Sequence, residues 1–260
     1  MPGAGGGGGL LSLPEALAVL LAGVGAGTIN AVVGSGTLIT FPVLLAVGYA
    51  PVVANVSNTI GLVPGTVASA IGYRRELRGQ GQRALRFGAA SVLGGIVGAV
   101  LLLELPASAF ETIVPVFIAV ALVLIVVQPR LAARLAARRR PGHEAHGPLS
   151  AGVFASGVYG GYFGAAQGIL LIAMLGTALP DDLQRVNALK NVLAGLVNLV
   201  AGVIFIVVAD VAWGPAALIA GGSIVGGTLG ARYGRRLPPS ALRAVIVVVG
   251  VFAIVRLLAG

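Results

Sequence analysis

The sequence predicts an all-α, polytopic membrane protein built from two inverted-topology repeats. Hydrophobic residues make up 57% of the 260 residues, charged residues only 10%, and the mean hydropathy is +1.01. Soluble domains carry about 25% charged residues, so this chain could not cover a water-facing surface. Spanning segments must satisfy every backbone polar group inside lipid, and we therefore expect helices.

Two stretches of sequence recur 132 residues further along the chain. Ser91-x-x-Gly94-Gly95-x-x-Gly98-Ala99 returns as Ser223-x-x-Gly226-Gly227-x-x-Gly230-Ala231, and Leu105-Pro106-x-Ser108-Ala109 returns as Leu237-Pro238-x-Ser240-Ala241. The first Leu-Pro loop lies between two glutamates, whereas arginines flank the second. Basic loops stay cytoplasmic, so the two loops are expected on opposite faces of the bilayer. This is the inverted repeat of secondary transporters. The repeated glycines are interpreted as helix-packing positions.

The elements follow in order along the chain. Residues 1–9 form a flexible glycine-rich N-terminus, 10–128 the first membrane repeat, 129–148 a basic linker and 149–260 the second repeat. Ordinary spans are predicted at 52–73, 84–104 and 111–128, matched by 186–208, 214–233 and 241–259.

A glycine-broken segment precedes each set of three spans, at 10–49 and 149–179. The second has 31 residues, whereas two full crossings need about 40, so we expect a hairpin of short or re-entrant helices. The total is ten helical segments, with eight full spans as the alternative.

Arginines assign the sides of the membrane. The loop 74–86 carries five arginines and one glutamate, and the linker 129–148 carries five arginines, so both are predicted to be cytoplasmic. The linkers at Glu104–Glu111 and Asp210–Trp213 lack basic residues and are predicted to be external. Both termini then lie outside an inner or plasma membrane. The linker is either a solvated basic segment or an amphipathic helix on anionic headgroups.

Polar residues form a matched face in the two halves. Asn55, Asn58 and Thr59 correspond to Asn187, Lys190 and Asn191, at spacings of i, i+3 and i+4 that place each set on one side of a helix. Asn198 extends the second stripe by two turns. Polar side chains at this depth mark transport pathways or hydrogen-bond between helices. We favour a binding site and keep the structural alternative open.

Lys190 is the only lysine in the chain. An ammonium in the membrane costs several kcal/mol (about 3 on insertion scales) unless it is paired or hydrated. The alternatives are a pair with Asp181, snorkelling to the cytoplasm, and an aqueous cavity that receives an anion. We favour the last.

The glycine-rich breaks also point to an anion. Gly34-Ser35-Gly36 in the first half corresponds to Ala166-Gln167-Gly168 in the second. Broken helices expose N–H groups at positive dipole ends, which favour anions. Uncharged donors near these ends complete the candidate substrate site: Asn30, Ser35, Thr37, Tyr162 and Gln167. The glycines themselves serve either the ligand or close packing.

Catalytic patterns are absent from the sequence. There is no cysteine, no histidine in a predicted span and no carboxylate pair at depth. We expect no enzyme activity, no cofactor and no metal site. The formal charge of +9 reflects cytoplasmic loops rather than nucleic-acid binding, so the expected partners are the lipid bilayer and a small anion.

The signature segments resemble the TauE/SafE sulfite-exporter family. They are Gly25-Ala26-Gly27-Thr28-Ile29-Asn30, then Gly34 to Pro42, then Pro51-x-x-Ala54-Asn55-x-Ser57-Asn58-Thr59, and in the second half Asn187 to Asn191 with Asn198. The resemblance implies a membrane transporter that exports a small anion such as sulfite or an organosulfonate. A channel-like anion conduit and a non-transporting membrane scaffold are the alternatives.

Overall fold

The computed structural model describes residues 11–137 and 146–234, and beyond them residues 244, 246–248, 251, 254 and 255. The described residues contain no strand. The helices are α1 (Leu13–Val32), α2 (Thr37–Ala46), α3 (Pro51–Gly72), α4 (Gly81–Glu104), α5 (Ala107–Ala137), α6 (His146–Tyr162), α7 (Gln167–Ala178), α8 (Leu183–Val208) and α9 (Trp213–Tyr233). The all-α prediction is confirmed.

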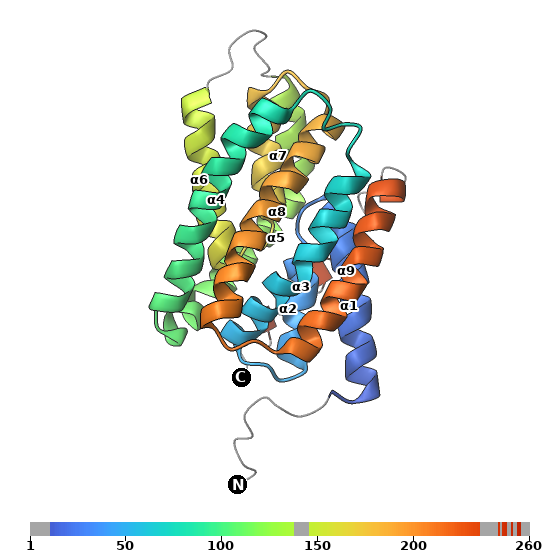
Figure 1. Cartoon of the computed structure of the whole chain (residues 1–260), viewed down its shortest axis with the longest axis vertical. Helices are drawn as coiled ribbons and strands as arrows, with labels where there is room; N and C mark the ends of the chain where they lie inside the picture. The colour runs from blue at the N-terminus through green and yellow to red at the C-terminus, as the bar shows by residue number, and fades with distance from the viewer. Residues whose placement is uncertain are drawn as a thin grey trace.

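The first two helices of each half form a hairpin that enters and leaves at one end of the bundle. In Figure 1, α1 and α3 both begin at the lower end, and α6 and α8 both begin at the upper end. With 10 and 12 residues, α2 and α7 are shorter than the roughly 20 residues that a crossing requires. Each hairpin therefore combines a longer helix with a half-helix that returns to its own side.

Helices from the two halves pack against each other through glycines. α1 lies along α9, and α4 lies along α6. A methyl group on Gly226 would lie 2.0 Å from the carbonyl oxygen of Val24, and one on Gly98 would lie 2.1 Å from that of Val158. The packing role predicted for the repeated glycines is confirmed. α4 ends at the lower end of Figure 1 and α9 at the upper end, as an inverted repeat requires, and the repeat itself stays a prediction.

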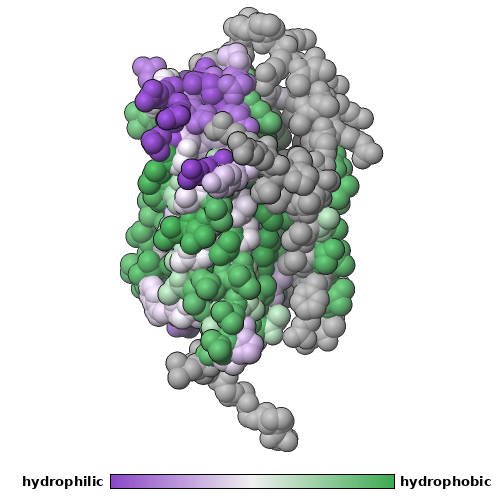
Figure 2. Space-filling model, turned by 90° about the vertical axis from the view of Figure 1, so that its right-hand side faces the viewer, coloured by the Kyte–Doolittle hydropathy of each residue, from purple (hydrophilic) through white to green (hydrophobic). Residues whose placement is uncertain are grey.

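The surface has the apolar belt of a membrane protein. Among the helices that the structure describes, five are long and apolar enough to cross a membrane: α1, α4, α5, α8 and α9. Large apolar side chains on them face outward, such as Leu21 at 67% exposure and Val207 at 78%. On the face drawn in Figure 2, hydrophobic residues cover the middle of the molecule, and hydrophilic residues gather at the upper end. The multi-pass membrane prediction is confirmed.

The element boundaries differ from the predicted ones in two places. α5 continues to Ala137, past the expected end at residue 128, because its helix-favouring Leu-Ala-Ala-Arg sequence has no helix breaker after Pro129. The second break lies before Gln167, so Gln167 and Gly168 are the first residues of α7 rather than part of the break. The predicted final span, 241–259, lies largely outside the described residues, and those described within it are helical.

Candidate functional site

The two helix breaks meet inside the bundle. Gly34 lies between α1 and α2 with φ of 83°, and Gly164 lies between α6 and α7 with φ of 74°. The N–H of Gly168 donates to the carbonyl of Gly34 at 3.0 Å. A methyl group on Gly34 would lie 2.4 Å from Cα of Gly168, and one on Gly36 would lie 2.6 Å from the carbonyl oxygen of Ala26. These glycines therefore provide close backbone packing, and a role for them in ligand binding stays a prediction.

The polar face of α8 covers the C-terminal end of α1. The amide groups of Asn187 and Asn191 both donate to the carbonyl of Ala31, at 3.0 and 3.2 Å. Nζ of Lys190 donates to the carbonyl of Asn30 at 2.8 Å and to Oδ1 of Asn191 at 3.0 Å. The last carbonyls of a helix have no partner within it, and α8 supplies partners from the other half of the chain.

The polar face of α3 makes the corresponding contact with α6. The amide of Asn55 donates to the carbonyl of Tyr162, the last residue of α6, at 2.9 Å. Asn58 donates from Nδ2 to Oγ1 of Thr37 at 3.3 Å and accepts from the hydroxyl of Thr40. Asn55 and Asn187 thus each cap a broken helix in the opposite half of the chain.

Several buried polar atoms at this crossing have no hydrogen-bond partner among the described residues. They are Oγ of Ser35, Oδ1 of Asn55, the hydroxyl of Tyr162 and Oδ1 of Asn187. Buried polar groups are normally paired. Ser35 lies in the first break and Tyr162 ends α6, while Asn55 and Asn187 bind the ends of α6 and α1. These residues therefore carry spare hydrogen-bonding capacity next to the two breaks.

The remaining predicted residues lie around this centre rather than in it. The hydroxyl of Thr59 donates to the carbonyl of Asn55 in its own helix at 2.9 Å. Gln167 donates to the carbonyl of Ser156 at 3.1 Å, within the second hairpin. Asn30 is half-buried, and its backbone carbonyl rather than its side chain contacts the centre, by accepting from Nζ of Lys190. Asn198 is half-buried further along α8, two turns beyond Asn191.

Lys190 is completely buried, at 0% exposure. It does not snorkel, and Asp181 instead pairs with Arg83 and, at 2.8 Å, with Nε of Arg185. The expected aqueous cavity is also not open at Lys190 in this conformation, because α1 and α8 enclose the side chain. The hydrogen bonds of Nζ go to neutral oxygens.

The ends of four helices set the electrostatics of the centre. α1 and α6 end at the breaks, and α2 and α7 begin there. Helix C-terminal ends carry partial negative charge and N-terminal ends partial positive charge. The first turns of α2 and α7 have no side-chain cap. The Lys190 ammonium compensates the negative end of α1, while the starts of α2 and α7 favour an anion.

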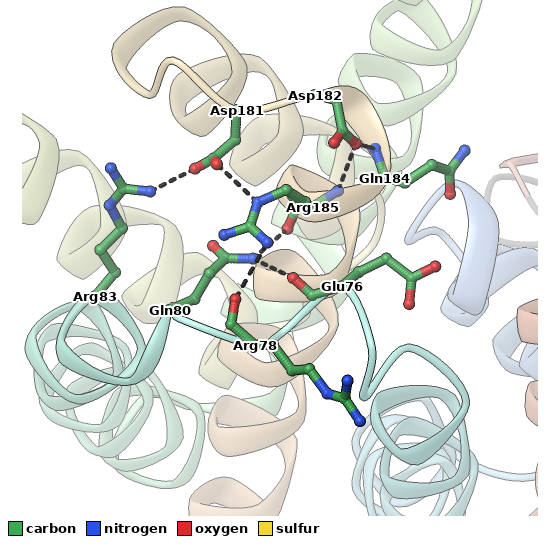
Figure 3. Close-up of polar contacts among 8 residues, drawn as sticks. All are labelled: Glu76, Arg78, Gln80, Arg83, Asp181, Asp182, Gln184 and Arg185. Carbon is green, nitrogen blue, oxygen red and sulfur yellow. Dashed lines mark hydrogen bonds and ion pairs between the residues drawn. The ribbon is translucent and has the colours of Figure 1, made fainter.

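A second polar cluster lies at the upper end of the bundle, where the α3–α4 and α7–α8 connections meet (Figure 3). Gln80 donates from Nε2 to the carbonyls of Glu76 and Arg185, at 2.8 and 3.1 Å, and Arg185 donates to the carbonyl of Arg78 at 3.1 Å. Asp182 caps α8 by accepting from the N–H groups of Gln184 and Arg185. This cluster fixes the start of α8 and therefore the position of its polar face.

Sequence reasoning missed Thr40 and Ser57. Thr40 bonds Asn58, and Oγ of Ser57 accepts from the N–H of Ala212 at 2.9 Å. Thr40 lies three residues after Thr37, so the i, i+3 spacing applied to α3 and α8 could have found it. The capping carbonyls left no signal, because a backbone carbonyl is present at every residue.

Comparisons with known proteins agree on one family. The family model for "Sulfite exporter TauE/SafE" matches residues 19–257. "Probable membrane transporter protein YfcA" of Escherichia coli (strain K12) is 27% identical over 241 residues, covering 90% of this chain and 86% of that protein. A "Probable membrane transporter protein" of Haemophilus influenzae is 26% identical over 236 residues, covering 90% and 91% of the two chains. No solved structure matches.

Proposed function

The chain belongs to the sulfite exporter TauE/SafE family of membrane transporters, and from that premise we propose that it exports a small anion such as sulfite or an organosulfonate. The proposed site is the crossing of the two broken hairpins between α3 and α8. The alternative is a channel-like anion conduit at the same place.

The ammonium of Lys190 carries this proposal. It is fully buried, its hydrogen bonds go to neutral oxygens, and no Asp or Glu of the described residues is buried. A buried cation without a carboxylate partner is costly, and an anionic substrate would supply the missing negative charge. An ammonium has three N–H donors, so the two hydrogen bonds of Nζ to Asn30 and Asn191 leave one N–H for the substrate.

Uncharged donors support the same site. The hydroxyls of Ser35 and Tyr162 are buried without partners, and each can donate a hydrogen bond to an oxyanion. The uncapped first turns of α2 and α7 add the positive ends of two helix dipoles. A sulfite or sulfonate group presents three oxygens and suits several donors that converge from different helices.

The membrane potential provides the energy in this proposal. An inside-negative potential drives anions outward by about 2.3 kcal/mol per charge per 100 mV. Proton coupling commonly uses a membrane-embedded carboxylate, and the described residues bury none. Electrical driving therefore needs no co-transported ion.

Thermal unfolding of the purified protein tests the site. Sulfite, sulfate and sulfoacetate are added as sodium salts at equal ionic strength, with sodium chloride as the control. At least one sulfur oxyanion is expected to raise the melting temperature in a saturable manner beyond the chloride control. Equal melting temperatures in all four salts would contradict the proposal.

A further inference from the structure

We propose that the C-terminal end of α1 and the polar face of α8 form a monovalent-cation site, and that the ammonium of Lys190 occupies it as a covalently attached ion. The protein would then need no sodium at this position. An inorganic cation could bind there only after the lysine side chain is removed.

The atoms around Nζ of Lys190 are those of an alkali-cation site. The two contacting atoms are a backbone carbonyl oxygen of Asn30 at 2.8 Å and the amide oxygen of Asn191 at 3.0 Å. Oδ1 of Asn187 is buried without a partner, on a side chain that binds the neighbouring carbonyl, that of Ala31. Hard cations bind oxygen ligands, and backbone and amide carbonyl oxygens are among them. Carbonyls at the ends of broken helices coordinate sodium in other transporters.

The helix dipole makes this position selective for positive charge. α1 has 20 residues and ends at the site, so its final carbonyls carry partial negative charge. An ammonium and a sodium ion carry the same charge and both accept oxygen ligands. The main difference is that the ammonium is attached to α8 and cannot leave.

The other half of the protein shows that capping alone does not need a cation. α6 ends in the corresponding way, and its terminal carbonyl is satisfied by the neutral amide of Asn55. The position matched to Lys190 is Asn58, which bonds Thr37 and Thr40 instead. A neutral residue is therefore compatible with a closed helix end, and the charge of Lys190 has a role of its own.

Removing the side chain tests the inference without any transported substrate. Lys190→Ala leaves both the oxygens and the space, whereas Lys190→Met fills the space without a charge. Each variant and the parent protein are melted in sodium, potassium or ammonium chloride, and in N-methyl-D-glucamine chloride at the same ionic strength. This large organic cation cannot enter the site.

Lys190→Ala is expected to melt about 5 °C lower than the parent protein in the organic cation, as for the loss of a charge-assisted hydrogen bond. A small inorganic cation should recover much of this difference in a saturable manner. The parent protein should have the same melting temperature in all four salts, and so should Lys190→Met. Asn191→Ala, which keeps the ammonium and loses one oxygen, should melt lower without gaining a cation response.

Parallel salt responses of the parent protein, Lys190→Ala and Lys190→Met would overturn the inference. The inference would also be overturned if Lys190→Met folds while Lys190→Ala folds in none of the salts. The site would then require the volume of the side chain rather than its charge. If neither variant folds, Lys190→Arg decides: a folded Lys190→Arg supports a required attached cation, and its failure contradicts it. The melting test stands whether or not the transported anion is identified.

Discussion

Asn55 and Asn187 occupy matched positions and each binds a carbonyl at the end of a broken helix, yet their surroundings differ. The carbonyl of Ala31 accepts from both Asn187 and Asn191, whereas the structure gives the carbonyl of Tyr162 one side-chain donor, that of Asn55. Redundant donors protect one helix end and leave the other dependent on a single side chain.

The asparagines should therefore differ in their effect on stability. Asn55→Ala leaves a buried carbonyl unpaired and should lower the free energy of unfolding by about 1–3 kcal/mol. Asn187→Ala should cost less, because Asn191 still donates to the same carbonyl. Melting temperatures of the two purified variants check the order, and a larger loss in Asn187→Ala would contradict the capping assignment.

Lys190 is expected to dominate anion affinity. Lys190→Ala should weaken binding of the transported anion by about 2 kcal/mol or more, the range for a charge-assisted contact, which is about 30-fold. Asn58→Ala, at the matched position, should have a smaller effect because it removes no charge. Titration calorimetry of both variants measures the difference. Unchanged affinity in Lys190→Ala would assign the residue to structure alone.

At the scale of the elements, glycines determine how closely the helices approach. In α9, a methyl group on Gly226 would lie 2.0 Å from the carbonyl oxygen of Val24, while one on Gly221 would meet no atom within 4 Å. The same helix thus offers a packed glycine and an open one.

Alanine substitutions on α9 should separate these two environments. Gly226→Ala must move α1 away from α9 and should destabilise the protein by about 1–3 kcal/mol. Gly221→Ala should be neutral or stabilise by up to about 1 kcal/mol, because alanine favours the helix. Thermal unfolding of both variants gives the comparison. Equal effects would show that the α1–α9 contact is loose.

Local patterns predicted the elements well, and contacts between distant segments escaped them. Gly34-Ser35-Gly36 indicates a break because glycine punctuates helices, and the Asn187, Lys190, Asn191 spacing indicates a polar face. That this face binds the end of α1 could not be predicted, since Lys190 and Asn30 are 160 residues apart. The burial of Lys190 likewise depends on how the two hairpins cross.

At the scale of the whole molecule, each hairpin packs against a helix of the other half, α1 with α9 and α6 with α4. The α3–α4 and α7–α8 connections lie at one end, and the α4–α5 and α8–α9 connections at the other (Figure 1). Arginines concentrate in the α3–α4 connection. The positive charge predicts that the end with the α3–α4 and α7–α8 connections is cytoplasmic.

Single cysteines test this orientation, because the chain has none. Ser108→Cys, at the start of α5, should react with a membrane-impermeant thiol reagent added outside intact cells. Gln82→Cys, at the start of α4, should react only after the cells are opened. Both positions are exposed. Labelling of both from the same side would contradict the assigned topology.

Anion flux under a controlled membrane potential tests the central claim most directly. Radiolabelled sulfite or sulfonate is loaded into proteoliposomes, the potential is clamped with valinomycin and potassium gradients, and efflux is measured without a proton or sodium gradient. Efflux should increase with inside-negative potential and decrease strongly in Lys190→Ala. Efflux that ignores the potential and requires a proton or sodium gradient would contradict electrically driven anion export.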